Sequence, residues 1–474
     1  MNTVSKWTLS FVTLLSVTLT TSAEIKLPQI IGENMVLQRN EPIVLWGWDD
    51  PGQQVNVAVA GKHGQATTDT AGQWMVRLDP LPAGGPHEIQ IKGSNTVSLA
   101  NVLVGEVWLC SGQSNMEWIV RNSNNPEEEI ANSEHPLIRH IKFAHRPSAQ
   151  PEDDSPTGGW LESNPANVPN FTAVGYFFAR HLKNELNVPI GLIGSNWGGT
   201  RIEPWTSPAG FKSVPALKSI GDNLADFPVV NPKGQVNHQS ALALYNGMIH
   251  SFRHFNFQGA IWYQGESNRG DAMMYYEKKK ALIQGWRDVF DDPDMPFLFV
   301  QLAPFTYGGS VTALPEIWEA QTAALQIKNT GMAVTVDIGN VKDIHPRNKQ
   351  DVGKRLALWA LANTYGQKDL VYSGPLYKKH KTSRNKIVIS FDHTGDGLVA
   401  RDGKALTHFQ IAGADKAFVD ATATVKGDTI VVQADAVDRP QAVRFAWHQL
   451  AEPNLSNANG LPASPFRTDD WKSE

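Results

Sequence analysis

Four short segments of the chain combine glycine or proline with hydrogen-bonding side chains, each shortly after an apolar run. They span residues 111–115, 195–201, 264–268 and 343–346, and read SGQSN, SNWGGTR, QGESN and DIHP. Between them they supply hydroxyls, an imidazole, carboxylates and amide donors. Acyl transfer requires this set: a nucleophile, a general base, a group that orients the base, and donors that stabilise an oxyanion.

The base and its orienting acid are both found in the last segment. A serine hydroxyl needs a base to remove its proton, and histidine is the usual base near neutral pH. Asp343 and His345 are two residues apart, so in an extended segment their side chains point to the same side. Pro346 favours an extended conformation for the histidine before it. We therefore expect Asp343 to orient His345, with Ser111 and Ser114 as candidate nucleophiles.

Glycine and amide side chains in the other segments are candidates for stabilising an oxyanion. Gly198 and Gly199 allow the backbone to approach closely and direct an N–H at a developing charge, and Gln264 can add a side-chain amide. Five further residues are candidates for substrate binding or for support of the site: Gln113, Asn115, Gly199, Arg201 and Glu266. Taken singly, each also has a structural interpretation. Arg201 can form a salt bridge behind the Gly-Gly turn, and Glu266 can sit at a helix N-terminus.

The elements that position these segments are strands of an α/β sheet. Buried-strand patterns (VLVGEVWLC, IGLIGSNW, GAIWYQGES, PFLFVQL and MAVTVDIGN) alternate with helical patterns such as VGYFFARHLKNEL and KQDVGKRLALWALAN between residues 101 and 370. This alternation predicts a mainly parallel sheet covered on both faces, which binds ligands at the carboxyl ends of its strands. The Pro-, Asn- and Ser-rich 130s and 210s are expected to be surface loops.

The two ends of the chain differ from this middle region. Residues 24–100 and 371–474 contain short alternating segments separated by turn signals, which predicts an N-terminal β-sandwich and a C-terminal β-module. Residues 1–23 resemble a secretory signal peptide, because Lys6 precedes a short apolar run and small residues lead up to a cleavage site near Ala23. We therefore expect a secreted or periplasmic protein without a membrane span.

Composition and motifs argue against several other functions. A net charge of −5 without a basic cluster indicates no nucleic-acid partner. The single cysteine, Cys110, excludes an intrachain disulfide and is expected to be a small buried residue. His250 and His254 are four apart but lack the adjacent glutamate of a zinc-protease motif, and no phosphate-binding loop is present. No metal or cofactor is expected. A noncatalytic carbohydrate-binding protein, using some of the 15 tryptophans, is the alternative of another class.

Five motifs in order resemble the SGNH (GDSL-like) hydrolase superfamily, and within it the sialate O-acetylesterase family: GQSNMEW, GSNWGGTRIEPW, IWYQGESN, DIHPRNKQDVGKRLA and GLPASPFRTD. The resemblance implies a flavodoxin-like three-layer α/β/α domain, here flanked by the two β-modules. By position it makes Ser114 the nucleophile, His345 the base and Gly198 an oxyanion donor, and Gln264 replaces the usual asparagine. Many superfamily members place the acid where this chain has Lys342, so Asp337 and Glu266 remain alternatives to Asp343.

The resemblance implies a metal-independent esterase that removes O-acetyl groups from sugars through an acetyl-serine. The substrate partner is then an acetylated carbohydrate. Two acceptors fit: sialic acid, for whose carboxylate Arg201 is a candidate ligand, and plant polysaccharides such as acetylated xylan or xyloglucan. The sequence contains no signal for a particular oligomeric state.

Overall fold

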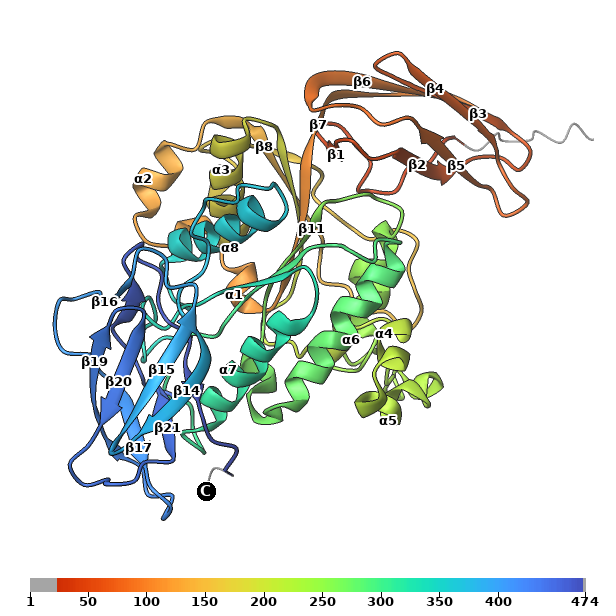
Figure 1. The fold of residues 1–474 in the computed structure, drawn as a ribbon. Coiled ribbons are helices and arrows are strands. Elements are labelled where there is room, and N and C mark those ends of the chain that lie inside the picture. Colours follow the sequence, from red (N-terminus) through yellow and green to blue (C-terminus); the bar gives the residue numbers. More distant parts are fainter. Residues whose placement is uncertain (1–23, 472–474) are drawn as a thin grey trace, which may run out of the picture.

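The structure, a computed structural model, describes residues 24–471. The expected signal peptide and its cleavage near Ala23 lie outside the described residues. The described chain forms a central α/β domain with one β-module at each end (Figure 1).

The centre of the α/β domain is a seven-stranded path in the order β13-β12-β11-β7-β10-β8-β9. Neighbouring strands are parallel throughout, except for the antiparallel edge strand β9. Five neighbouring strands have the spatial order β10-β7-β11-β12-β13. Numbered along the chain from β7, this is the 2-1-3-4-5 order of flavodoxin-like sheets, and β8 and β9 lie beyond β10. The strands are β7 (Thr96–Gly112), β8 (His135–Lys142), β9 (Leu161–Ser163), β10 (Ile190–Asn196), β11 (Gly259–Tyr263), β12 (Phe297–Val300) and β13 (Thr330–Ala333).

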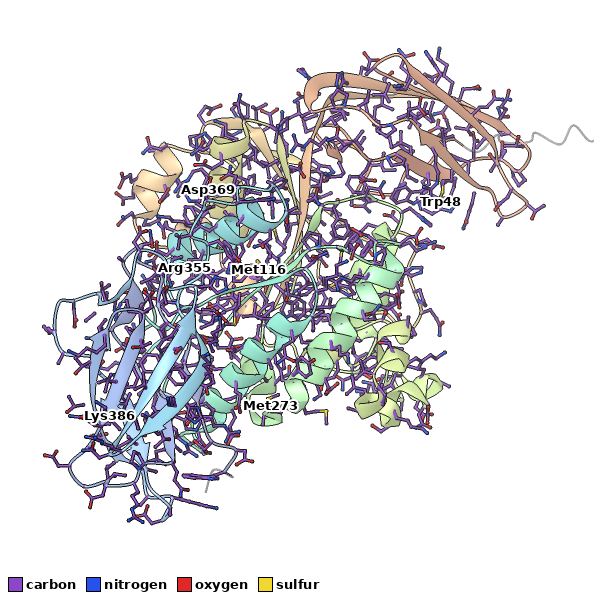
Figure 2. The ribbon with its side chains drawn as sticks, in the orientation of Figure 1. Trp48, Met116, Met273, Arg355, Asp369 and Lys386 are labelled. Atoms are coloured by element: carbon purple, nitrogen blue, oxygen red, sulfur yellow. The ribbon has the colours of Figure 1, made fainter. Side chains whose placement is uncertain are left out.

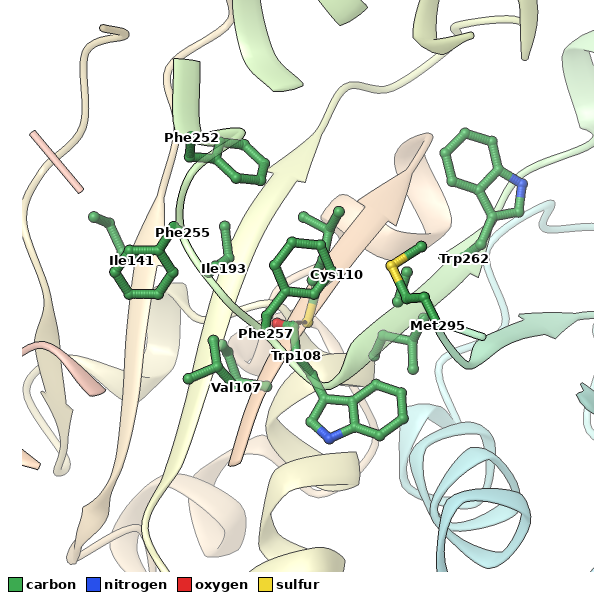
Figure 3. Close-up of a cluster of buried hydrophobic side chains, with 14 of the residues drawn as sticks. Val107, Trp108, Cys110, Ile141, Ile193, Phe252, Phe255, Phe257, Trp262 and Met295 are labelled. Carbon is green, nitrogen blue, oxygen red and sulfur yellow. Dashed lines mark hydrogen bonds between the residues drawn. The ribbon is translucent and has the colours of Figure 1, made fainter. Parts of the chain in front are cut away.

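Strand β7 is 17 residues long and belongs to two regions of the molecule. Its first part pairs with β6 (Gly84–Lys92) of the N-terminal module, and its second part lies between β10 and β11. The second part is buried throughout and contains the apolar residues 107–110, as expected for a central parallel strand that is covered on both faces. Figure 3 shows Trp108 and Cys110 of β7 within the hydrophobic core. The expected boundary at residues 100/101 falls inside β7, and the division into domains stays a prediction.

Helices cover both faces of the sheet (Figure 1): α3 and α8 lie on one face, and α4, α6 and α7 on the other. Glycine allows the close packing of α3 and α8, since a Cβ on Gly353 would lie 2.6 Å from the backbone nitrogen of Phe178. The helices are α1 (Ser114–Glu117), α2 (Pro126–Ala131), α3 (Ala173–Leu186), α4 (Pro208–Ser213), α5 (Lys218–Gly221), α6 (Met274–Val289), α7 (Ala313–Ala323) and α8 (Lys349–Asn363). The helical patterns predicted for α3 and α8 are confirmed.

Both ends of the chain are β-rich, as predicted. The N-terminal module contains β1 (Val36–Gln38), β2 (Ile43–Trp48), β3 (Gln54–Val59), β4 (Lys62–Thr67), β5 (Gln73–Leu78) and β6. The C-terminal module contains β14 (Leu376–Ser383), β15 (Lys386–Asp392), β16 (Leu398–Ala400), β17 (Phe409–Ala412), β18 (Val419–Asp420), β19 (Thr422–Lys426), β20 (Thr429–Gln433), β21 (Ala442–Phe445), β22 (Leu455–Asn457) and β23 (Phe466–Arg467). Its two four-stranded sheets enclose a hydrophobic core of their own.

Two expectations about local structure are wrong. The 130s are not a surface loop, because residues 135–142 form β8, which pairs with β10 inside the sheet, and the 210s contain short helices. The strand predicted for residues 332–340 ends at Ala333, and the rest of that segment is loop and turn. Irregular chain therefore separates the sheet from His345.

Candidate active site

The nucleophile candidate Ser114 lies where β7 ends and the chain turns into α1. Gly112 makes this turn possible: its φ is +133°, and a Cβ there would lie 2.2 Å from the carbonyl oxygen of Tyr263 in β11. Ser114 is the first residue of α1 and is half-buried. The other candidate nucleophile, Ser111, is the penultimate residue of β7 and is fully buried. Only Ser114 can therefore meet a substrate.

His345 reaches Ser114 from the loop between β13 and α8. Its Nε2 lies 2.9 Å from Ser114 Oγ, a distance at which the imidazole can take the hydroxyl proton. The indole of Trp118, at the end of α1, stacks on the imidazole with ring centroids 4.9 Å apart. The structure thus brings together two residues that are 231 positions apart in the sequence.

The position of Asp343 fits the role of the orienting acid. Its Oδ1 accepts the backbone N–H of His345 at 3.0 Å and lies 3.6 Å from Nδ1 of the same residue. The 3.6 Å contact is an ion-pair distance and too long for a hydrogen bond. The two side chains meet through a turn closed by the Asp343 carboxylate, so the expectation of an extended segment is wrong.

The two alternative acids are engaged elsewhere. Asp337 forms a two-pronged salt bridge with Arg355 of α8, with both N–O distances 2.7 Å. Figure 2 labels Arg355 near the junction of α8 and the C-terminal module. Glu266 is half-buried, and its carboxylate accepts a hydrogen bond from Asn115 at 2.6 Å. Neither carboxylate contacts the imidazole in the described structure, so Asp343 remains the best candidate.

The surroundings of His345 favour its neutral form. Burial lowers the pKa of His345 below its ordinary value of 6.5, and the positive charge of Lys349 lowers it further. The carboxylate of Asp343 opposes both effects by stabilising the imidazolium. A histidine that stays neutral at slightly acidic pH can act as a base there.

The oxyanion donors differ in their availability. The N–H of Ser114 lies in the first turn of α1, where helix geometry provides no acceptor. Gly198 is adjacent, since a Cβ on it would lie 3.2 Å from Ser114 Cβ. However, the Gly198 N–H donates to Glu117 Oε2 at 2.8 Å. Gly198 can therefore serve an oxyanion only when the carboxylate of Glu117 releases it.

The structure does not support Gln264 as an oxyanion donor. Its amide nitrogen donates to the carbonyl of Thr200 at 3.1 Å and to Asn268 Oδ1 at 2.7 Å, and its Oε1 accepts the hydroxyl of Tyr275. Gln264 is fully buried. Both amide hydrogens are thus committed to structural bonds, and this side chain ties the loop after β11 to the loop after β10.

The residues expected to support the site connect the loops at this edge of the sheet. Gln113 Oε1 accepts the N–H groups of Gly265 at 3.3 Å and Ser267 at 3.4 Å. Gly199 adopts φ +75°, and its carbonyl accepts bonds from the side chains of Gln239 and Ser267. These contacts hold the loops that follow β7, β10 and β11 together.

Arg201 is part of an ion-pair cluster. Its guanidinium contacts Glu203 at 3.0 Å and Asp271 at 3.0 Å, and it also donates to the carbonyl of Ser267. Lys278 contacts the same two carboxylates. This arrangement favours the structural interpretation of Arg201 over the ligation of a substrate carboxylate.

Three residues at the site were not singled out from the sequence: Glu117, Trp118 and Lys349. Hydrogen bonding to His145 and the charge of Lys142 outweigh burial and lower the pKa of Glu117 to about 2, so Glu117 is ionised at neutral pH. Trp118 and Glu117 follow Ser114 within one helical turn. A lysine at the first position of a helix lies at the positive end of the helix dipole, which disfavours its charge. This unusual position is the feature of the sequence that could have drawn attention to Lys349.

Metal ligands, membrane-spanning helices and the single cysteine were also considered in the described part of the chain. Within residues 24–471 no three His, Cys, Asp or Glu side chains gather closely enough to hold a metal ion. Nor does this part of the chain contain a helix with the length and apolar character needed to cross a membrane. Cys110 is free and fully buried, as expected, and burial raises the pKa of its thiol far above the usual range.

A serine, a histidine and an aspartate meet at the carboxyl edge of a flavodoxin-like sheet, beside the point between β7 and β11 where the strand order reverses. The fold is that of SGNH-type hydrolases, and the three side chains lie in the order that a Ser-His-Asp triad requires. A family model described as "Carbohydrate esterase, sialic acid-specific acetylesterase" matches residues 104–362. The chain belongs to this family and is a carboxylic ester hydrolase, which confirms the resemblance noted from the sequence.

Similar proteins extend the match to nearly the whole chain. Human sialate O-acetylesterase is 32% identical over 92% of this chain and 91% of its own length. The mouse protein of the same name is 31% identical over 92% of this chain and 93% of its own. A crystal structure described as a novel carbohydrate acetylesterase from Xanthomonas citri has a TM-score of 0.87 and 41% identity, covering 94% of this chain and all of that one.

Proposed function

We propose that this enzyme removes acetyl groups from O-acetylated sugars through an acetyl-serine intermediate on Ser114. The observation that carries the proposal is the 2.9 Å contact between Ser114 Oγ and His345 Nε2 at an accessible edge of the sheet. The family and its sialate O-acetylesterase members support an acetylated carbohydrate as the substrate.

The reaction proceeds in two halves. In the first, His345 takes the proton of Ser114, whose Oγ attacks the acetyl carbonyl carbon to form a tetrahedral oxyanion. His345 then gives this proton to the sugar oxygen as the ester C–O bond breaks. In the second half, His345 deprotonates a water molecule that attacks the acetyl-serine, and acetate leaves as Ser114 regains its proton.

The oxyanion is stabilised by the backbone at two places. The Ser114 N–H is the first donor, and the Gly198 N–H becomes the second when the carboxylate of Glu117 turns away from it. Lys142 and His145 hold the other carboxylate oxygen of Glu117, so Glu117 keeps two partners after it releases Gly198. Loss of one oxyanion donor in such sites costs on the order of 10²–10³ in turnover.

Two acceptor sugars are consistent with this proposal: acetylated sialic acid, and neutral plant polysaccharide such as acetylated xylan or xyloglucan. The names of the curated relatives favour sialate. The engagement of Arg201 by Glu203 and Asp271 removes the one ligand that the sequence offered for the sialate carboxylate. Comparing acetate release from sialylated and xylan-type substrates distinguishes the two acceptors. The amino-terminal segment supports action outside the cytoplasm, in the periplasm or after secretion.

The Ser114→Ala variant tests the mechanism. Because the hydroxyl is the attacking group, we expect the variant to fold but to release no acetate from p-nitrophenyl acetate. Ser111→Ala is the matched control, since Ser111 is buried in β7 and should leave the rate nearly unchanged. Acetate release by Ser114→Ala at the wild-type rate would exclude the acetyl-serine. A wild-type protein that binds sugar but releases no acetate would point to a noncatalytic carbohydrate-binding role.

A further inference from the structure

Lys349 occupies a position that is unfavourable for a lysine in two respects. It is the first residue of α8, where the positive end of the helix dipole disfavours a cation. It is also completely buried, although burying an ammonium group without compensation carries a large free-energy cost. A residue retained under these conditions needs specific partners.

Those partners lie directly behind the active site. The Lys349 ammonium donates to Asn115 Oδ1 at 2.5 Å, and Asn115 is the residue after Ser114. The aromatic rings of Tyr263 and Trp118 face the same ammonium, at 5.1 and 5.7 Å from their centroids. Trp118 also stacks on His345, so one ring contacts both the base and this lysine.

Asn115 extends the contact to two other loops. Its amide nitrogen donates to Glu266 Oε1 at 2.6 Å and to the carbonyl of Ile344 at 3.1 Å. Because Oδ1 faces a cation and the amide nitrogen faces two acceptors, the orientation of this amide is determined. Lys349, Asn115 and Glu266 therefore connect the nucleophile's helix, the loop after β11 and the residue next to His345.

The charges in this network affect the pKa of His345 as well as its position. Burial lowers the pKa of Lys349 to about 7, against the opposing effects of Glu266 and Asp343, and burial raises the pKa of Glu266. Ser114, Trp118 at the end of α1 and Asp343 of its own loop contact His345, and Lys349 of α8 acts on it through its charge. Of these, Asp343 stabilises the imidazolium and Lys349 opposes it.

We propose that Lys349 is a positioning residue for the esterase reaction. Through Asn115 it holds the His345 loop against Ser114, and its charge keeps the imidazole in the neutral form that accepts the proton. This inference rests on the proposed function of Ser114 and His345. It assigns Lys349 a role beyond the structural support of α8.

The sign of the pH effect follows from the two titrations. His345 titrates below pH 6.5, where Lys349 with a pKa of about 7 still carries its charge. The charged form of Lys349 therefore predominates over the acidic limb of the rate profile. Removing it raises the pKa of His345, so the acidic limb of kcat/KM moves to higher pH.

The test is the pH profile of kcat/KM for p-nitrophenyl acetate in four variants. In Lys349→Met we expect the acidic limb to move up by roughly half a pH unit or more and the plateau to fall at least about tenfold. Lys349→Arg keeps the charge and should keep the limb. Lys349→Gln keeps an N–H donor without the charge, so it should show the same shift with a smaller loss of rate. Lys342→Met removes an exposed lysine from the same loop and should leave the profile unchanged.

The outcomes separate the alternatives. A limb that stays in place in both Lys349→Met and Lys349→Gln overturns the charge effect, and an unchanged plateau in both overturns the positioning role. If Lys349→Met does not fold, as judged by its thermal transition, Lys349→Gln is assessed by the same criteria. Failure of the proposed function is a different result, because wild-type protein would then release no Ser114-dependent acetate.

Discussion

At the scale of single residues, the site depends on how the imidazole of His345 is covered and held. One face of the ring lies against Trp118, Nε2 contacts Ser114, and Asp343 lies on the Nδ1 side. Covering the ring excludes water and disfavours the imidazolium, whereas the carboxylate favours it. The balance lowers the pKa of His345, which suits a base that works at mildly acidic pH.

Trp118 should therefore influence the pH dependence of the reaction. In Trp118→Ala the imidazole loses the ring that shields it from water, so we expect its pKa to rise towards 6.5 and the acidic limb of kcat/KM to move to higher pH. Trp118→Phe keeps an aromatic cover and should stay close to wild type. The measurement is kcat/KM for p-nitrophenyl acetate between pH 4.5 and 8. An unchanged limb in Trp118→Ala would show that the indole does not shield the base.

Replacing each of the two aspartates that are candidates for the orienting acid should affect a different property of the enzyme. Asp343→Asn keeps the turn but loses the charge beside Nδ1, so we expect kcat to fall by about 10²–10⁴ with the fold intact. Asp337→Asn weakens the partner of Arg355, which is 8% exposed, and should lower thermal stability with a smaller effect on rate. Measuring kcat and Tm for both variants identifies the orienting acid. A larger rate loss in Asp337→Asn would overturn the assignment to Asp343.

At the scale of elements, the reacting groups lie on irregular chain next to rigid supports. Ser114 begins a one-turn helix after the buried second part of β7, and His345 precedes α8, whose N-terminus is capped by Asn348. The pattern of KQDVGKRLALWALAN predicts α8, because helical periodicity is a local property. The end of β13 at Ala333 was missed, since the apolar residues up to Val336 continue into buried loop. Strand β8 was missed because its Pro- and Asn-rich surroundings indicated a loop.

The close packing of α8 on α3 should be sensitive to a single methyl group. In Gly353→Ala the new Cβ would lie 2.6 Å from the backbone of Phe178 and 2.7 Å from Phe177 Cβ, and neither atom can move away easily. Overpacking of this kind costs about 1–3 kcal/mol, more than the 0.5–1 kcal/mol that alanine gains over glycine in a helix.

Urea unfolding of Gly353→Ala measures this loss as a lower midpoint. Gly32→Ala is the control, because a Cβ at Gly32 meets no atom within 4 Å. Equal midpoints for Gly353→Ala and wild type would mean that α3 and α8 can separate without cost.

At the scale of the whole molecule, the N-terminal module is joined to the α/β domain through β7. Strand β1 pairs with β7 in parallel, and Arg39 and Gln38 both bond the carboxylate of Glu106, which is 1% exposed. The active site lies at the opposite, carboxyl end of β7. We therefore infer that this module stabilises the sheet and does not take part in the reaction.

Arg39→Met should lower stability without changing the chemistry. It removes the charge partner of a buried carboxylate, which costs about 2–3 kcal/mol after allowing for the partial exposure of Arg39. Activity per folded molecule should stay at the wild-type level. Lys62→Met breaks an exposed ion pair with Asp79 and should cost less than about 1 kcal/mol. Thermal unfolding and kcat measure the two effects, and a lower kcat in folded Arg39→Met would contradict a purely structural role.

Features that depend on local sequence pattern could be predicted before the chain's fold was known. Buried runs predicted β7, β10, β11, β12 and the first part of β13. Helical spacing predicted α3 and α8, and ordered motifs identified the family and selected Ser114 and His345. Hydrogen bonds and ion pairs between segments far apart in the sequence could be assigned only from the folded chain. It gave the amide of Gln264 to Thr200 and Asn268, the N–H of Gly198 to Glu117, and the carboxylate of Asp337 to Arg355. A side chain's type specifies which bonds it can make, whereas only the folded chain determines which partner comes within reach.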